Sequence, residues 1–383
     1  MLFLCFFSTV GIDFYLSLYY NKSEQIPILK ISHEGKERGF NMKYNVLVTL
    51  PDGNIKDTFL PREVLDYLEE NFNVKYNTLG RNFNPKELKE NLKDIDLVLT
   101  GWGVPSFGDD MLEGNDRLKM IASTGGSVAD IVDAGVYAKG IKVCSGNYYY
   151  AESVAEGTAA YIMACLRNIP DDVARLREGA WQSPDLQPTQ GLLDQEIGII
   201  SCGAISKILM QMLQVFRCSF KVYSAHPIDP EFLKSVNAKQ VSLEEVLKTC
   251  HIVSLHSSLN EKTRGMLGRE EFEMMQEDSV FINTARGAII RQDEMTEVLA
   301  SRPKMRAVLD VFDGEPLRVD SPLRQLPNVY CNPHRGGPTI DRRKYIGMAM
   351  VRELLHFVNG EPLEHEIAQD VAARMTSHKR KTV

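Results

Sequence analysis

The sequence predicts an α/β protein built from two doubly wound parallel sheets. From Met42 onward short apolar or β-branched runs alternate with helical patterns, and a second series of the same kind begins at Glu196. Strict alternation of strand and helix favours a parallel sheet with helices on both faces. A length of 383 residues, with 44% hydrophobic and 25% charged residues, is typical of a soluble protein with two globular domains.

The elements can be assigned in chain order. The first series predicts strands over residues 45–50, 95–100, 119–124 and 141–145, and helices over 61–70, 85–91 and 129–139. The second predicts strands over residues 197–200, 220–224, 251–256, 280–284 and 307–312, and helices over 204–216, 243–248, 269–276 and 292–300. Two longer helices are expected over 151–170, which is rich in small residues, and over 342–360, whose apolar residues recur at helical spacing.

These elements suggest a domain plan. We expect residues 42–150 to form the first domain, 151–335 the second, 336–366 a helix that returns to the first domain, and 367–383 a tail. The apolar stretch at the amino terminus has no basic start and no small-residue cleavage site, and Asp13 interrupts it. Residues 1–41 are therefore expected to lie outside the fold, with Met42 as the native start.

Charge and cysteine content exclude several classes of function. The net charge of −7 argues against a surface for nucleic acid or for an anionic membrane, since either needs a clustered basic face. The seven cysteines lie far apart, without the spacing of a disulfide framework or a zinc site. We therefore expect a cytoplasmic protein without a metal.

The stretch EIGIISCGAISK, residues 196–207, resembles a dinucleotide-binding corner. That corner places Gly-x-Gly-x-x-Gly between a buried strand and a helix, and Ser201, Gly203 and Ser206 occupy the three positions here. Gly203 keeps the close backbone approach, and Ser206 falls at a packing position. If the turn requires a positive φ at Ser201, we expect a cost of about 1 kcal/mol and a several-fold loss of affinity that glycine would restore. The amides of Ala204 and Ile205 would still face a pyrophosphate.

The ribose position does not decide between nucleotides. The acidic residue that holds the adenosine ribose in NAD sites would fall on Ser224, or on His226 in a shifted register, and neither is a carboxylate. An NADP site would place an arginine nearby, and residues 225–229 contain none. NAD is favoured and NADP is not excluded.

Three polar side chains follow predicted strands of the second series. These are Arg286 in INTARG, Glu315 in LDVFDGEP and His334 in PHRGG. Each alone has an ordinary structural interpretation. Together they match the reduction of a 2-oxo acid, in which a cation holds the carboxylate and an acid protonates the carbonyl oxygen. Arginine offers a bidentate fork for the first task, and a histidine beside a carboxylate suits the second.

These motifs, together with SVAEGT and SLHSSLNEKTRGMLG, resemble the D-isomer-specific 2-hydroxyacid dehydrogenases over about residues 42–364. The resemblance implies a flavodoxin-like substrate domain and a Rossmann cofactor domain, with the reaction in the cleft between them. It implies that Arg286 binds the substrate carboxylate, that His334 is the general acid/base and that Glu315 is its partner.

The same resemblance assigns the binding residues. The loop STGGS would hold the substrate carboxylate through Gly125, Gly126 and Ser127, and Asp310 would contact the nicotinamide carboxamide. Further cofactor contacts are assigned to Ser258, Thr263, Thr284 and Ala285.

The resemblance also leaves alternatives for the function. The main interpretation is an NAD(P)-dependent homodimer that reduces a small 2-oxo acid. A hydroxypyruvate, glyoxylate or phosphoglycerate specialist is one alternative. A low-turnover scaffold that senses nucleotides is another, because two glycines of the cofactor corner are replaced.

Overall fold

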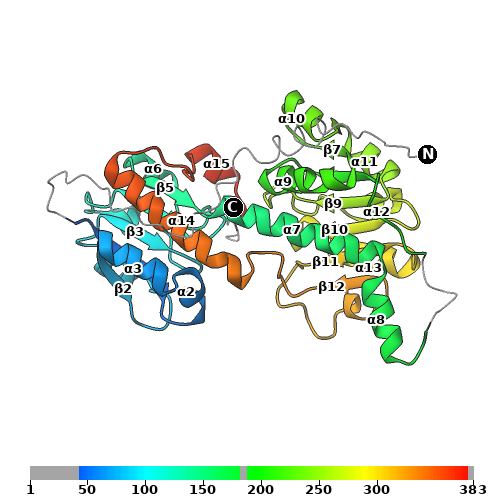
Figure 1. Cartoon of the computed structure of the whole chain (residues 1–383), viewed down its shortest axis with the longest axis horizontal. Helices are drawn as coiled ribbons and strands as arrows, with labels where there is room; N and C mark the ends of the chain where they lie inside the picture. Colours follow the sequence, from blue (N-terminus) through cyan, green and yellow to red (C-terminus); the bar gives the residue numbers. More distant parts are fainter. Residues whose placement is uncertain (1–42, 182–187, 378–383) are drawn as a thin grey trace, which may run out of the picture. The chain divides into compact units, whose positions relative to one another are not determined.

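The computed structural model describes residues 43–181 and 188–377 (Figure 1). The predicted leader, residues 1–41, and the basic residues 379–381 lie outside this range. Within the described residues, no helix combines the length and the apolar character needed to cross a membrane.

The first lobe is built on a five-stranded parallel sheet with the order β2-β1-β3-β4-β5. Its strands are β1 (Asn45–Pro51), β2 (Asn73–Asn77), β3 (Leu97–Thr100), β4 (Met120–Ser123) and β5 (Lys142–Ser145). This 2-1-3-4-5 order is that of flavodoxin-like folds, as predicted. The second strand, β2, was not predicted.

Helices cover both faces of this sheet because the strands are apolar on both sides. Val46 and Val48 of β1 pack with the long helix α14 (Ile340–Asn359), while Leu47 faces the opposite core. The chain thus returns after the second lobe to complete the first. The other helices are α2 (Asn54–Phe59), α3 (Arg62–Asn71), α4 (Pro85–Asn91), α5 (Asp109–Leu112), α6 (Ala134–Ala138) and α15 (Gln369–Arg374).

Two expectations for this lobe need correction. The helix predicted over residues 129–139 begins only at Ala134, because Asp133 caps it by accepting hydrogen bonds from the amides of Gly135 and Val136. Part of the predicted tail is also folded. Residues Gln369–Arg374 form α15, and Ile367 and Ala372 are buried in the core of the first lobe.

The second lobe carries a seven-stranded parallel sheet with the order β12-β11-β10-β9-β6-β7-β8. The strands are β6 (Glu196–Ile200), β7 (Ser219–Tyr223), β8 (Ala238–Gln240), β9 (Ile252–Leu255), β10 (Val280–Asn283), β11 (Arg306–Leu309) and β12 (Val329–Cys331). Numbered from β6, this is the Rossmann order 3-2-1-4-5-6 with a seventh strand added at one edge. The strand order reverses between β6 and β9, where such sheets bind dinucleotides. Of the two edge strands, β8 was not predicted, and β12 was expected only as the strand that precedes His334.

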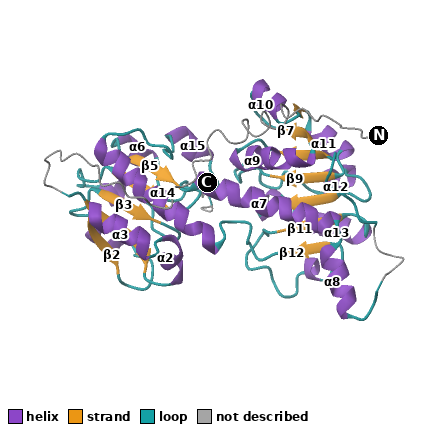
Figure 2. Cartoon of the chain, in the orientation of Figure 1, coloured by secondary structure: helices purple, strands orange, loops and turns teal. Residues whose placement is uncertain are grey.

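Helices line both faces of this second sheet, whose strands are orange in Figure 2. One face packs against α7 (Asn147–Leu166) and α9 (Ala204–Met212), and the other against α11 (Leu243–Thr249), α12 (Arg269–Met274) and α13 (Gln292–Ser301). Ala155 of α7 is buried in the core shared with α9, in accord with the small residues of this helix. The remaining helices are α8 (Ile169–Arg177), α10 (Pro230–Ser235) and the 3-10 turns η1 (Leu213–Phe216), η2 (Gly287–Ile289) and η3 (Pro322–Arg324).

Candidate active site

Three neighbouring strands of the second sheet deliver the predicted catalytic residues to one edge. β10, β11 and β12 are adjacent and parallel, so their carboxyl ends lie together. Arg286 follows β10, Glu315 lies in the loop after β11, and His334 follows β12. The fold therefore gathers residues that are up to 48 positions apart in the sequence (334 − 286).

His334 and Glu315 form a direct hydrogen bond. The imidazole Nδ1 lies 2.6 Å from Glu315 Oε2, and the other carboxylate oxygen accepts the Phe312 amide at 3.0 Å. A carboxylate only accepts, so Nδ1 carries the proton and Nε2 is the free end of the ring. No partner for Nε2 occurs among the described residues, and the His334 side chain is 45% exposed. The pair thus fixes the ring and leaves one nitrogen available for a substrate.

Arg286 is a cation that is short of partners. Its Nη1 donates to the carbonyl oxygen of Ala285 at 2.6 Å, but its buried Nε has no acceptor within the described chain. Burial lowers the pKa of Arg286, and the nearby Glu315 carboxylate opposes that effect. A buried guanidinium with an unmade hydrogen bond favours an anionic ligand.

Gly287 brings the arginine segment against the loop that carries Glu315. A Cβ at this position would lie 1.8 Å from the carbonyl carbon of Phe312, so only glycine permits this approach. Backbone contact, rather than a side-chain bond, therefore sets the distance between the segments that carry Arg286 and Glu315.

Asp310 organises the turn that carries His334. Its buried carboxylate accepts the amides of Arg335 at 2.8 Å and Gly336 at 2.7 Å, and the Tyr161 hydroxyl at 3.1 Å. The resemblance assigns Asp310 to the nicotinamide, but in the structure both of its oxygens already serve the backbone. Tyr161, on α7, was not predicted.

A second residue of α7 supports the segment after β10. Thr158 Oγ1 lies 3.1 Å from Thr284 Oγ1, and both side chains are buried. The amide of Ala285 donates to Asn283 Oδ1 at 3.0 Å. Nothing in the sequence signals the Thr158 contact, because the two threonines are 126 positions apart.

The predicted cofactor corner has the expected shape. β6 ends at Ile200, Ser201 adopts φ of 81°, and α9 begins at Ala204 with Gly203 as its N-cap. A Cβ at Gly203 would meet nothing within 4 Å, so the space beside the helix start is open. The first-turn amides of a nine-residue helix face that space, which fits the pyrophosphate of a dinucleotide.

Ser206 does more than pack. Its buried hydroxyl accepts the Gly203 amide at 2.8 Å and donates to the Gly203 carbonyl oxygen at 3.1 Å. The serine that replaces the third glycine therefore ties the first turn of α9 together.

The other assigned cofactor residues lie in turns at the same edge of the sheet. Ser224 directly follows β7, and its hydroxyl accepts the His226 amide at 3.2 Å. The hydroxyl of Thr263 donates to the Ser258 carbonyl oxygen at 2.6 Å, which closes the turn after β9.

The predicted substrate loop follows β4 in the first lobe. Ser123 Oγ accepts the Gly125 amide at 3.1 Å, and the Ser127 hydroxyl donates to the Thr376 carbonyl oxygen at 2.8 Å. Among the described residues, no acceptor is bonded to the amide of Gly126 or to that of Ser127. These two amides are therefore the donors that the loop can offer to a carboxylate.

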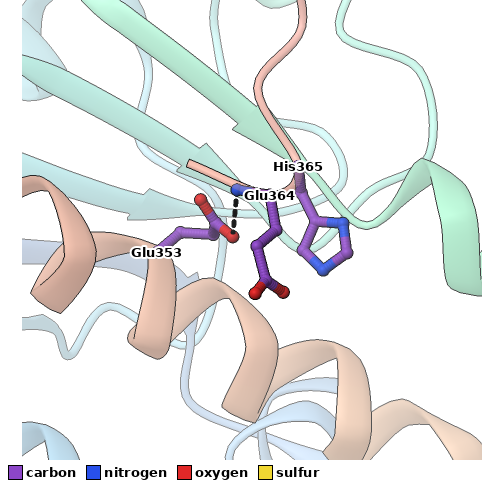
Figure 3. Close-up of side chains that lie close together, drawn as sticks. All are labelled: Glu353, Glu364 and His365. Atoms are coloured by element: carbon purple, nitrogen blue, oxygen red, sulfur yellow. Dashed lines mark hydrogen bonds between the residues drawn. The ribbon is translucent and has the colours of Figure 1, made fainter. Parts of the chain in front are cut away.

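A different group of ligand-type side chains lies between the end of α14 and β5 (Figure 3). The donor atoms of Glu353, Glu364 and His365 lie within 4.8 Å of one another. The buried Glu353 carboxylate already accepts the Glu364 amide at 3.1 Å and the Cys144 thiol at 3.5 Å. We therefore interpret Glu353 as a residue that holds the chain after α14.

Comparison with known proteins places the chain in a family. The family described as D-isomer specific 2-hydroxyacid dehydrogenase, NAD binding domain, matches residues 159–336. A hydroxypyruvate reductase of Thermotoga maritima is 30% identical over 270 residues, which cover 70% of this chain and 86% of that protein. A D-3-phosphoglycerate dehydrogenase of Methanocaldococcus jannaschii is 29% identical over 309 residues, which cover 80% of this chain but only 58% of that protein.

A solved structure supports the same conclusion at the level of the fold. A glyoxylate reductase from Paecilomyes thermophila superposes with a TM-score of 0.71 at 22% identity, covering 86% of this chain and 99% of that one. The fold and the sequence matches indicate the same family. The fold contributes the two strand orders and the corner between β6 and α9. The chain belongs to the D-isomer specific 2-hydroxyacid dehydrogenase family and contains the NAD-binding domain of that family.

Proposed function

We propose that the protein catalyses reversible hydride transfer between NAD(P)H and a small 2-oxo acid, giving a D-2-hydroxy acid. The observation that carries this proposal is the His334–Glu315 pair, with its free Nε2, beside the partly unpaired Arg286. As the family resemblance implies, the reaction would take place between this group and the substrate loop of the first lobe.

Each side chain has one task in the proposed mechanism. The Arg286 guanidinium binds the substrate carboxylate, and the free amides of Gly126 and Ser127 add donors. His334 Nε2 gives a proton to the carbonyl oxygen during reduction and takes it back from the hydroxyl during oxidation. The Glu315 carboxylate stabilises the imidazolium form of the ring. A dinucleotide held through its pyrophosphate at the corner between β6 and α9 would supply or accept the hydride.

A panel of 2-oxo acids with NADH and NADPH tests the proposal. We expect cofactor oxidation above background with at least one acid. His334→Ala should lower kcat by about 10² to 10⁴-fold, because general acid/base catalysis contributes that much. Arg286→Lys should mainly raise KM, because a point charge cannot reproduce a bidentate grip.

His251→Ala is the matched control, because His251 directly precedes β9 in the same lobe, at the opposite end of the strands from the catalytic group. It should retain activity. If no acid in the panel is reduced while NADH still binds, the nucleotide-sensing scaffold is the better description. Unchanged turnover in His334→Ala would contradict the role given to that residue.

The assembly and location are part of the same proposal. We propose a homodimer that works in the cytoplasm, as the family resemblance and the six described free cysteines suggest. Light scattering during size-exclusion chromatography measures the mass, and a single monomer peak at micromolar concentration would reject the dimer.

A further inference from the structure

Four side chains meet beside the proposed substrate loop and have no role in the mechanism above. They are Phe59 at the end of α2, Trp102 after β3, Tyr150 in the first turn of α7 and Arg343 in the first turn of α14. Trp102 meets Phe59 and Tyr150 edge to face, with ring centroids 5.2 and 6.3 Å apart. We call this group the Trp102 cluster.

The cluster adjoins the glycines of the substrate loop. A Cβ built on Gly125 would lie 3.7 Å from Trp102 Cδ1, and one built on Gly126 would lie 3.0 Å from Tyr150 Cγ. Trp102 is 43% exposed, an unusual fraction for so large an apolar side chain. An acid held by the amides of Gly126 and Ser127 would have its remaining atoms next to these rings.

Arg343 gives the cluster a positive charge that no carboxylate of residues 43–181 and 188–377 neutralises. The guanidinium carbon lies 5.3 Å from the centre of the Trp102 ring and 5.5 Å from that of Phe59. Its hydrogen bonds are long, at 3.4 Å to Thr58 Oγ1 and 3.4 Å to the Pro338 carbonyl oxygen. No carboxylate of the described chain forms an ion pair with it, whereas its neighbour Arg342 pairs with Glu152 at 3.3 Å. Several of the five guanidinium donors remain available.

Tyr150 adds a buried hydroxyl without a hydrogen bond. No described residue bonds to its oxygen, although the atom is shielded from solvent. Burial raises the pKa of Tyr150, while the charge of Arg343 and an interaction with the Trp102 indole, which falls outside hydrogen-bond geometry, act to lower it. The Arg343 guanidinium carbon and the Tyr150 ring lie 5.3 and 6.3 Å from the centre of the Trp102 ring, so both groups border the same side chain. A buried unpaired polar group costs about 1–3 kcal/mol, which a ligand could recover.

We propose that the Trp102 cluster is the subsite for the group that extends from the carbonyl carbon of the substrate, and that this group carries a second negative charge. The preferred substrates are then dianionic 2-oxo acids, with either a second carboxylate or a phosphate ester. Arg343 and Tyr150 bind the second anion, and Trp102 covers the carbon chain between the two charged ends. This inference rests on the proposed function and names its substrate class.

The test compares kcat/KM for two groups of acids with the full-length protein. Pyruvate and hydroxypyruvate carry one negative charge, while oxaloacetate, 2-oxoglutarate and 3-phosphohydroxypyruvate carry a second anionic group. We expect at least one of the latter to be preferred about tenfold or more. Arg343→Gln should lower its kcat/KM by about 10 to 100-fold, the value of hydrogen bonds to a charged group, and leave the first group within threefold.

Arg342→Gln is the matched control, because it removes a neighbouring arginine of the same helix that is paired with Glu152. It should leave the preference unchanged, and Arg343→Lys should restore part of it. The acid whose kcat/KM falls most in Arg343→Gln shows whether the second anion is a carboxylate or a phosphate. An equal loss for both groups of acids in Arg343→Gln would show a structural role and overturn the inference, as would a wild-type preference for pyruvate.

Calorimetry separates this inference from the proposed function. If no 2-oxo acid is reduced, the proposed function fails, and the binding of 2-oxoglutarate and pyruvate still tests the subsite. Tighter binding of 2-oxoglutarate that Arg343→Gln removes would support the subsite. Equal binding of the two acids, or binding of neither, would reject it.

Discussion

Ser201 shows how the structure changes an expectation at the scale of one residue. Its φ of 81° belongs to the folded backbone of the turn itself, so we expect the cost of this conformation, about 1 kcal/mol, to act on folding more than on binding. Ser201→Gly relieves that cost but adds about 0.4–1 kcal/mol of unfolded-state entropy. We therefore expect less than a threefold change in the NADH dissociation constant and little change in stability.

Ser206→Gly is the informative comparison for this corner. It removes both hydrogen bonds to Gly203 and places a glycine in the first turn of α9, which together should cost about 1–2 kcal/mol. Urea unfolding and calorimetric titration of the two variants measure these effects. A fivefold or larger gain in NADH affinity for Ser201→Gly would show that the strain does act on binding.

His256 should make the protein sensitive to mild acid. The ring is buried, Nε2 bonds to Ser254 Oγ at 2.9 Å, and Nδ1 has no partner in the described chain. Burial lowers the pKa of His256 from 6.5 to about 4. The unfolded chain then binds the proton more readily than the folded one, so stability is complete above pH 6.5 and falls as the pH drops toward 4.

Comparison with His256→Gln isolates this effect. Between pH 7 and 5 the free energy of unfolding of the wild type should fall by about 2 kcal/mol more than that of the variant. This follows from a slope of about 1.36 kcal/mol per pH unit below pH 6.5. Burial also lowers the pKa of His251, but this residue is present in both proteins, so its effect on the pH dependence of stability cancels in the comparison. Urea unfolding at several pH values gives the two slopes, and parallel slopes would mean that His256 already binds its proton in the folded state.

The sequence predicted the site residues that follow strands better than the residues that support the site through hydrogen bonds. Arg286, Glu315 and His334 could be found because motif positions follow apolar runs, and parallel strands bring such ends together. Tyr161 and Thr158 lie inside a long helix, where nothing distinguishes a residue that supports the site from one that packs. Their partners are 149 and 126 positions away, and single-sequence periodicity carries no information over that distance.

At the scale of elements, the central strands and the apolar edge strand β5 were predicted, whereas the edge strands β2 and β8 were missed. β3, β4 and β10 are buried on both faces and read as continuous apolar runs. β2 has one buried residue among five, and β8 has three residues, of which two are exposed. An edge strand has a partner on one side only, so its sequence need not be apolar. This is why the Rossmann order could be expected while its outermost strand β8 could not.

Two helical glycines give an element-scale prediction with opposite signs. A Cβ at Gly347 of α14 would lie 1.8 Å from the Phe59 carbonyl oxygen, so α14 and α2 can touch only through this glycine. Gly347→Ala should therefore destabilise the protein by about 1–3 kcal/mol. A Cβ at Gly157 of α7 would meet Gly336 at 3.7 Å, an ordinary contact. Gly157→Ala should instead stabilise the protein by up to about 1 kcal/mol through helix propensity.

Thermal and urea unfolding of these two variants provide the measurement. Both variants replace a helical glycine with alanine, so helix propensity contributes about equally to their stabilities. The difference between their free energies of unfolding therefore measures the contact between α14 and α2. If Gly347→Ala were as stable as the wild type, α14 would have to sit farther from α2 than the structure places it.

At the scale of the whole molecule, nucleotide binding should increase the free energy of unfolding. A ligand that binds only the folded state stabilises it by about 2.7 kcal/mol at a concentration of 100 times its dissociation constant. Ser224 and His226 place no carboxylate at the end of β7, so NADH and NADPH should protect the wild type to within about 1 kcal/mol of each other.

Ser224→Asp should separate the two nucleotides. A carboxylate there can still accept the His226 amide as the serine hydroxyl does, so the turn should persist. The new charge attracts the ribose hydroxyls of NADH and repels the 2′-phosphate of NADPH, and we expect the ratio of the two dissociation constants to shift about tenfold or more. Ser235→Asp, on an exposed serine of α10, adds the same charge away from the corner and should leave the ratio unchanged. Melting temperatures with each nucleotide, over a range of concentrations, give both ratios. Equal protection by both nucleotides in Ser224→Asp would place the ribose elsewhere than at the end of β7.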